Sequence, residues 1–270
     1  MGIIAYNGKR SIDYGLIVER YPAPNKPARR GTVLQIPGRN GSLVIEDGTY
    51  ENVTLKFDVY ISAETGGIYG RAMGIANWLL GSSGYQELST EYEPDTFRLA
   101  RFAGPLDIEA ILNSHGRATL EFDCYPQQYI ALGQIYGYYD NIATDGSYII
   151  ENLYYTVAKP MIKVTGKGYV SLYFSNDAST DTTEVGIQFS ENQTETIILD
   201  CDLHDAYYAD GSNANAVVSF HDPYGRVPED THYFYPTFPS FYPGENTVAL
   251  GEFFTGTISG LRIAPRWWTL

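Results

Sequence analysis

Residues 53–60, VTLKFDVY, determine the fold that we expect for the first half of the chain. Apolar residues occupy every second position, in the order Val53-Thr54-Leu55-Lys56-Phe57-Asp58-Val59-Tyr60. A period of two places the apolar side chains on one face of an extended chain, as in a half-buried β-strand. This stretch therefore predicts a strand that covers a hydrophobic core with one of its faces.

Turn signals on both sides of this strand predict further strands in the first half. Asn7-Gly8, Asn40-Gly41 and Asp47-Gly48 are residue pairs typical of tight turns, and we expect each to separate two strands. Tyr125-Pro126 is expected to end a strand, because proline cannot donate to a strand ladder. Residues 21–31, rich in proline and basic residues, predict an extended connector or arm.

Residues 68–80 break the alternation of the first half. Ile68, Ala72, Ile75, Ala76 and Leu79 fall on one face at helical spacing. Gly81 follows, as a glycine often does at the end of a helix. We expect one helix here and none elsewhere in the chain.

The second half reads as short strands separated by turns. Segments such as 161–165, 169–174, 184–189 and 195–199 combine β-branched and aromatic residues. Seven or more such segments without a helix predict an antiparallel β-sandwich. We expect two modules, residues 1–130 and 131–270.

The charge of the chain limits its function. The formal net charge is −14, and residues 134–270 hold 6 basic and 17 acidic residues (net −11) against 12 and 15 (net −3) in residues 1–133. This excess of acid disfavours binding to nucleic acid phosphates and to anionic membranes. The sequence predicts no signal peptide and no membrane span, which favours synthesis in the cytosol.

Residues that could carry chemistry are few and scattered. The spacing of Cys201 and His204 is typical of zinc ligands, and the loop 177–184 could bind Ca²⁺, but neither has a full ligand set. Abundant carboxylates, Asp200 among them, single out no pair for glycoside hydrolysis. We expect two buried free thiols, no cofactor, no metal and no catalytic residue.

Contact residues are easier to propose than catalytic ones. His221, Asp222, Trp267 and Trp268 are the nearest candidates for contacts with a sugar or other ligand in the second module, although paired tryptophans more often pack against a core. Basic residues of the arm could contact nucleic acid, but in an acidic protein they more readily meet acidic surfaces of a neighbouring subunit.

The motifs together resemble the distal tail protein (Dit) family of long-tailed, non-contractile phages. In the first half, the resemblance rests on Asn7-Gly8, Asp13-Tyr14-Gly15-Leu16, Ile36-Pro37-Gly38-Arg39-Asn40-Gly41, Glu46-Asp47-Gly48-Thr49-Tyr50, Ile75-Ala76-Asn77-Trp78-Leu79, Gly84-Tyr85-Gln86, Pro94-Asp95, Phe97-Arg98, Ala100-Arg101, Glu121-Phe122 and Cys124-Tyr125-Pro126-Gln127. In the second half, it rests on Ile198, Asp200-Cys201, Phe238-Pro239, Pro243-Gly244-Glu245-Asn246 and Pro265-Arg266-Trp267-Trp268.

This resemblance implies a mainly β protein with a mechanical role. A β-sandwich or barrel-like N-terminal domain, with one helix and a protruding hairpin, would build a hexameric ring in which the hairpin clasps the neighbouring subunit. A galectin-like antiparallel β-sandwich would lie outside the ring. For the subunit contacts, the candidates are Arg29, Arg30, Ile36, Arg39 and Tyr50.

The same resemblance implies the location and the partners. The ring would join the tail-tube protein to the tail-tip protein at the virion tail tip, after assembly in the host cytoplasm. It could anchor a receptor-binding protein, and DNA would pass through its channel without sequence-specific contact. Two alternatives stay open: a carbohydrate-binding module that attaches to the host cell wall through residues 131–270, and a glycan-cleaving enzyme.

Overall fold

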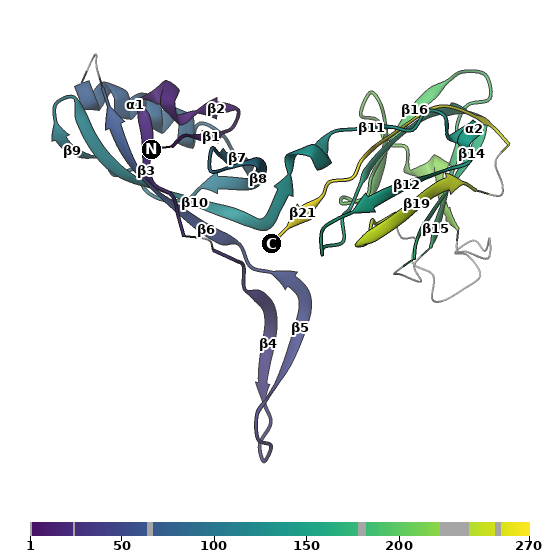
Figure 1. Ribbon diagram of the computed structural model, residues 1–270, viewed down its shortest axis with the longest axis horizontal. Coiled ribbons are helices and arrows are strands. Elements are labelled where there is room, and N and C mark those ends of the chain that lie inside the picture. The colour runs from purple at the N-terminus through teal and green to yellow at the C-terminus, as the bar shows by residue number, and fades with distance from the viewer. Residues whose placement is uncertain (1, 24, 64–66, 178–181, 222–237, 252–254) are drawn as a thin grey trace. The chain divides into compact units, whose positions relative to one another are not determined.

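The computed structural model describes residues 2–23, 25–63, 67–177, 182–221, 238–251 and 255–270. The chain divides into two compact units, Met1–Tyr129 with Leu270, and Ile130–Thr269 (Figure 1). Antiparallel strands dominate both units. The mainly β fold expected from the sequence is confirmed.

The first unit is built on one curled antiparallel sheet with the order β2-β1-β7-β8-β10-β6-β3, and β9 pairs with one end of β10. A separate pair, β4 and β5, forms a two-stranded sheet of its own. The elements are β1 (Ile4–Tyr6), β2 (Lys9–Arg10), β3 (Leu16–Arg20), β4 (Arg29–Gln35), β5 (Ser42–Tyr50), β6 (Val53–Ser62), α1 (Gly67–Leu80), β7 (Gln86–Thr90), β8 (Glu93–Phe102), β9 (Glu109–Leu112), β10 (His115–Ile130) and a 3-10 turn at Ser11–Tyr14.

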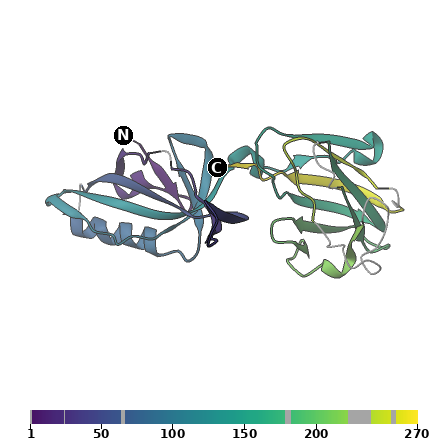
Figure 2. The ribbon, with the colours of Figure 1, turned by 90° about the horizontal axis from the view of Figure 1, so that it is seen from below.

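Helix α1 and the apolar face of the sheet share the core of the first unit (Figure 2). The alternation seen in residues 53–60 buries Val53, Phe57 and Val59, while the polar residues between them stay toward solvent. Phe122 of β10 lies at the centre, with its ring centroid 5.1 Å from that of Tyr6. The strand and the helix predicted from periodicity are therefore both present.

One strand is longer than the sequence indicated. Strand β10 continues to Ile130, so the prediction that Tyr125-Pro126 ends it is wrong. The ladder between β10 and β6 stops at Cys124 opposite Val53, and Pro126 lies beyond it. A proline without an N–H loses nothing on that side, and its carbonyl accepts a hydrogen bond of 2.7 Å from Arg98 Nη1.

Two further expectations for the region 21–50 need correction. Asp47-Gly48 does not end a strand but forms an irregularity within β5, because Asp47 Oδ1 accepts hydrogen bonds from the Thr49 N–H and hydroxyl at 2.8 and 2.7 Å. The expected arm of residues 21–31 is already strand from Arg29 onward. Pairing with β5 extends the strand into the basic segment.

The second unit is a sandwich of two five-stranded antiparallel sheets, ordered β11-β20-β13-β16-β17 and β12-β19-β14-β15-β18. Apolar residues from both sheets form a single core. The elements are β11 (Gly137–Tyr138), β12 (Ser147–Asn152), β13 (Met161–Lys167), β14 (Tyr169–Asn176), β15 (Thr183–Gln188), β16 (Glu195–Asp200), β17 (Asp205–Tyr208), β18 (Val218–His221), β19 (Gly244–Leu250), β20 (Thr257–Ala264), β21 (Trp268–Thr269), and 3-10 turns at Ala131–Gln134 and Asn215–Val217.

The prediction of a single helix in the chain is wrong. A short helix, α2 (Ile142–Asp145), precedes β12. Ile142 is fully buried in the sandwich core, and Gly146 follows with a φ of 78°. One turn of helix has too few residues to display a helical period, and the sequence therefore gave no sign of it.

The central position of Phe122 yields a stability prediction. Phe122→Ala removes a fully buried ring and should lower the free energy of unfolding of the first unit by about 3–5 kcal/mol, because the cavity adds to the lost burial. Urea unfolding measures this difference. Tyr69→Ala, on the exposed side of α1 with the side chain 79% exposed, should stay within about 0.5 kcal/mol of the parent protein; equal losses in both variants would contradict the assigned core.

Candidate assembly surface

The hairpin of β4 and β5 is the most exposed structure in the first unit (Figure 1). All seven residues of β4 are exposed, and so are eight of the nine in β5. In the described chain, the two strands pair only with each other. A two-stranded hairpin buries too little surface to be stable alone, so this element needs either an anchor or a partner.

Local chemistry explains why the hairpin forms. At its tip, the Arg39 N–H donates to the Ile36 carbonyl at 3.1 Å, and Gly38 takes a φ of 82°. With Pro37 before that glycine, this is the arrangement of a type II turn. Below the tip, Val33 faces Val44 across the ladder.

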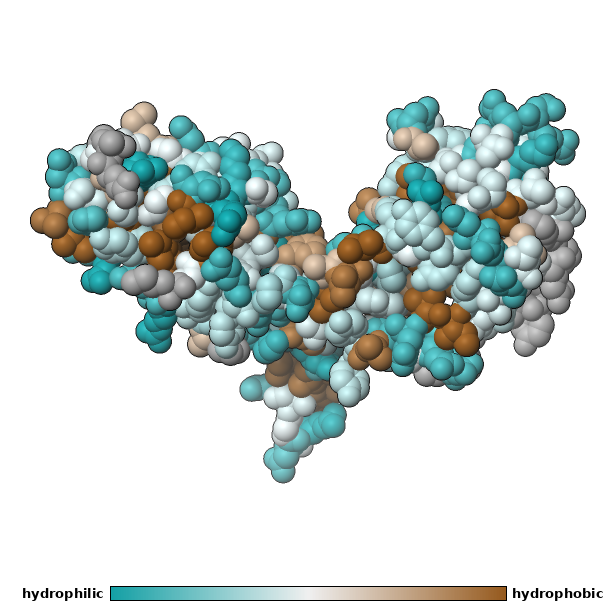
Figure 3. Space-filling view, turned by 45° about the horizontal axis from the view of Figure 1, so that its top comes forward, coloured by the Kyte–Doolittle hydropathy of each residue, from teal (hydrophilic) through white to brown (hydrophobic). Residues whose placement is uncertain are grey.

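Apolar side chains lie on both faces of this hairpin. Val33 and Val44 share one face and are 62% and 56% exposed. On the other face, Leu34 lies opposite Leu43, and both are exposed. Figure 3 shows this apolar surface on the hairpin. A contiguous exposed apolar patch on a soluble protein marks an interaction site.

The five predicted contact residues divide between the two ends of the hairpin. Near the root, Arg29 Nη1 lies 2.8 Å from Glu46 Oε2, and its guanidinium lies 5.9 Å from the centre of the Tyr50 ring. Arg30 is exposed next to it. Ile36 and Arg39 form the turn at the tip. Their roles in subunit contacts stay predictions.

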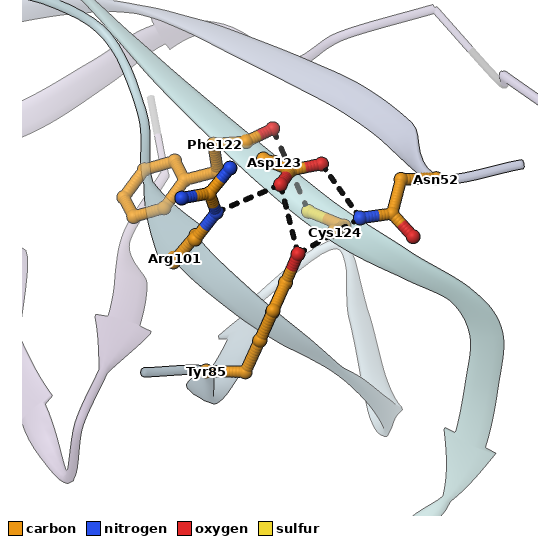
Figure 4. A network of polar contacts seen from close by, with 6 residues as sticks. All are labelled: Asn52, Tyr85, Arg101, Phe122, Asp123 and Cys124. Atoms are coloured by element: carbon orange, nitrogen blue, oxygen red, sulfur yellow. Dashed lines mark hydrogen bonds and ion pairs between the residues drawn. The ribbon is translucent and has the colours of Figure 1, made fainter. Parts of the chain in front are cut away.

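A polar cluster, the root clamp, fastens the hairpin to the main sheet of its unit (Figure 4). It consists of Asn52, Tyr85, Arg101 and Asp123. Asn52 lies in the two-residue link between β5 and β6, and its Nδ2 donates to Asp123 Oδ1 and to the Tyr85 hydroxyl, both at 2.9 Å. Asp123 Oδ2 accepts from the Tyr85 hydroxyl at 2.9 Å and from Arg101 Nε at 2.8 Å. The clamp joins the hairpin link to β10, β8 and the segment before β7.

The electrostatics of the clamp favour a charged Asp123. Burial raises the pKa of this carboxyl, but the hydrogen bonds from Arg101, Asn52 and Tyr85 outweigh it and lower the pKa below its ordinary value. Conversely, burial and the adjacent Asp123 raise the pKa of the Tyr85 hydroxyl. The Arg101 guanidinium also lies 5.8 Å from the Tyr85 ring centre. Three donors on one carboxylate fix the position of the hairpin root.

Two comparisons identify the kind of protein to which this geometry belongs. Residues 12–124 match the family model of the phage tail protein RIFT-related domain. The N-terminal unit is a phage tail protein domain. A crystal structure of the SPP1 Dit protein, described as a paradigm of the hub adsorption apparatus in phages that infect Gram-positive bacteria, matches with a TM-score of 0.65 over 97% of each chain at 13% identity. Curated proteins yielded no match.

Both findings support the resemblance to distal tail proteins that the sequence motifs indicated. At 13% identity, the structural match shows that the two chains share a fold. The family and the fold are those of a structural tail component and not of an enzyme class. In the described part of the chain, no helix is long and apolar enough to cross a membrane.

The structure describes the candidate ligand residues of the second unit only in part. Trp267 and Trp268 are half-buried against the sandwich core. The Trp268 indole N–H donates to the Val157 carbonyl at 3.0 Å. His221 ends β18, opposite Glu184 in register, and Asp222 lies outside the described residues. Carbohydrate binding through these residues stays a prediction.

Other groups that could have carried chemistry have structural roles. Cys124 and Cys201 are buried free thiols, as expected, and burial raises the pKa of Cys124 to about 12. The His204 ring stacks on Phe238 with centroids 5.5 Å apart. Within the described ranges, no group of three or more histidine, cysteine or acidic side chains could hold a metal ion.

An ion pair joins two of the motifs on which the family resemblance rested. Asp200, at the end of β16, makes two contacts with Arg266, Nη1 to Oδ1 at 2.6 Å and Nη2 to Oδ2 at 3.0 Å. Arg266 has a φ of 57°, a conformation that is uncommon for a residue with a side chain. The Asp200 carboxylate is neutralised, which argues against a role as a catalytic acid.

No pattern in the sequence indicates the root clamp. Asp123 and Asn52 are 71 residues apart, and nothing local links them. The alternation in β10 does place Asp123 on the solvent face, beside Arg101 of the neighbouring strand β8. The alternation in β10 is the one sequence signal for this site. It predicts that the Asp123 side chain faces solvent, but not which residues contact it.

The root clamp yields a prediction with a defined pH dependence. Asp123→Asn should lower the free energy of unfolding by about 2 kcal/mol at neutral pH, because it removes charge-assisted hydrogen bonds. Hydrogen exchange should also quicken at the amides of Asn52 and Val53. Since the folded pKa of Asp123 is lowered, its contribution is complete above the unfolded pKa of about 3.9 and disappears as the pH falls through the folded value.

Chemical unfolding at pH 7 and at successive steps down to pH 3 measures this difference. The gap between the parent and Asp123→Asn should be constant above about pH 4.5 and narrow below it. Glu121→Gln is the matched control on the same strand, since it removes an exposed ion pair with Lys56 of 2.8 Å and should cost under about 1 kcal/mol. If hydrogen exchange at the amides of Asn52 and Val53 were as slow in Asp123→Asn as in the parent, the clamp would not hold the hairpin root.

Proposed function

We propose that this phage tail protein is a structural hub of the tail tip, which assembles with copies of itself into a hexameric ring. The observation that carries the proposal is the exposed apolar hairpin of β4 and β5, fixed at its root by a polar clamp. The family match over residues 12–124 and the shared fold with a protein described as a hub support it.

The hairpin fits the needs of a closed ring. A ring is built from heterologous contacts, in which one surface of each copy meets a different surface of the next. An element that stands clear of its own sheet and exposes apolar side chains on both faces can insert between neighbours. The root clamp lowers the entropy cost of that contact, because it holds the hairpin in one direction before binding.

The ring would connect other parts of the virion. We expect one side to meet the tail-tube protein and the other to meet the tail-tip protein, with a receptor-binding protein as a further partner. A chain with a net charge of −14 suits a channel through which DNA passes without being held, because retention would need basic residues to neutralise phosphates. The role is mechanical, with no reaction assigned.

Ring formation can be tested on the purified chain. Size-exclusion chromatography with light scattering should give six copies per particle at micromolar concentrations, and electron microscopy should show six-fold rings with a central hole. Val44→Asp places a charge in the exposed apolar face of the hairpin and should raise the concentration for half-assembly at least about tenfold.

The matched control for this variant lies on α1. Met73→Asp makes a similar change at a side chain that is 70% exposed and should assemble like the parent. A parent chain that stays monomeric at high micromolar concentration would contradict the hub proposal. Normal rings formed by Val44→Asp would contradict the role of the hairpin.

A further inference from the structure

Strand β12 is an open edge of the second unit. It is the terminal strand of its sheet and pairs with β19 through all six of its residues, Ser147–Asn152. In the described chain, its other backbone edge has no strand beside it. Natural proteins cover, charge or shorten such edges, because a free edge accepts a further strand.

Exposed apolar side chains lie on β12 and in the loop after it. Ile149 is 62% exposed, Leu153 is 75% exposed and Tyr155 is 100% exposed. Asn152, which is 3% exposed, holds this loop: its Nδ2 donates to the Thr156 carbonyl at 2.9 Å and its Oδ1 accepts from the Tyr154 N–H at 3.0 Å. A large aromatic side chain on a fixed backbone is the kind of group that anchors protein interfaces.

Unpaired carboxylates lie beside these apolar side chains. Glu151 and Glu245 face each other directly across the β12–β19 ladder, and both are exposed. Asp177 follows Asn176, which pairs with Asn246 next to Glu245, and is exposed as well. Among the described residues, none of the three carboxylates takes part in an ion pair. Like charges opposite one another are unfavourable, so a cation from a partner would be stabilising here.

Strand β4 of the hairpin has the complementary chemistry. Its free edge carries Arg29 and Arg30 beside the exposed Val33 and Leu34. Arg29 is already paired with Glu46, whereas Arg30 makes no direct ion pair in the described structure and acts on Asp47 of the hairpin only at longer range. The partner strand β5 carries both acidic residues of the hairpin, Glu46 and Asp47, and would repel an acidic edge. The two strands β4 and β12 have seven and six residues, so their lengths match.

We infer that β4 of one copy adds to the β12 edge of a second copy as an antiparallel strand, with Arg30 beside Glu151. This direction brings the basic end of β4 to the acidic end of β12 and its apolar part toward Ile149. The contact joins two different surfaces of the same chain, as a ring requires. The inference rests on the proposed self-assembly and names the surface that receives the hairpin.

A charge exchange tests this contact on the full-length chain. Arg30→Glu and Glu151→Arg should each raise the concentration for half-assembly at least about tenfold, because each sets like charges against one another. An equal mixture of the two variants should assemble like the parent, since every contact then regains one positive and one negative partner. Light scattering over a concentration series reads out all three samples, and circular dichroism confirms that each variant is folded.

Glu191→Arg is the control, because it makes the same charge change at an exposed loop of the same unit and should leave assembly unchanged. Assembly of both single variants at the parent concentration would overturn the inference and leave the hub proposal intact. Recovery in the Arg30→Glu, Glu151→Arg double variant without recovery in the mixture would place the contact inside one chain and overturn it too. A parent protein that never assembles would instead overturn the hub proposal.

Discussion

The Asp123 carboxylate holds the root of the β4–β5 hairpin against the main sheet. The β4–β5 pair cannot stabilise itself, since nearly every residue in it is exposed. Its link to the sheet is two residues long, and Asn52 in that link binds Asp123 and Tyr85. Arg101 neutralises the carboxylate from the next strand. One charged group on β10 therefore holds the root of the hairpin, together with the backbone hydrogen bond of 2.9 Å from the Glu51 N–H to the Ala28 carbonyl.

The solvent face of the main sheet in the first unit differs in chemistry from the hairpin. Cross-strand ion pairs cover the solvent face of its sheet: Lys56 with Glu121, Arg117 with Glu19, and Arg101 with Asp123, each within 3.0 Å. Such exposed pairs add little stability, but they satisfy the charges within one chain. Paired charges attract no partner strongly, so this face of the sheet offers less for a charged partner than the hairpin, whose exposed side chains are apolar.

Periodicity predicted the parts of the fold that bury a continuous face. The alternation in residues 53–60 and the helical spacing in residues 68–80 both appear as expected, because each segment follows a single period. The predictions that proved wrong rested on single turn residues. Pro126 and Asp47-Gly48 are turn residues by composition, yet the neighbouring strands absorb them. The clamp and the pair of Asp200 and Arg266 join residues 71 and 66 positions apart, and no local pattern encodes such contacts.

The unequal charge of the two halves acquires a structural meaning. In the described chain, five ion pairs lie within the first unit and one, between Asp200 and Arg266, within the second. The second unit therefore keeps unpaired carboxylates at an open strand edge, while the hairpin keeps an unpaired arginine. If every charge were paired within one chain, electrostatics would not orient a neighbouring copy. Unpaired charges of opposite sign on the two units can orient it. Electrostatic attraction would select the register, and the apolar side chains around it would supply the affinity.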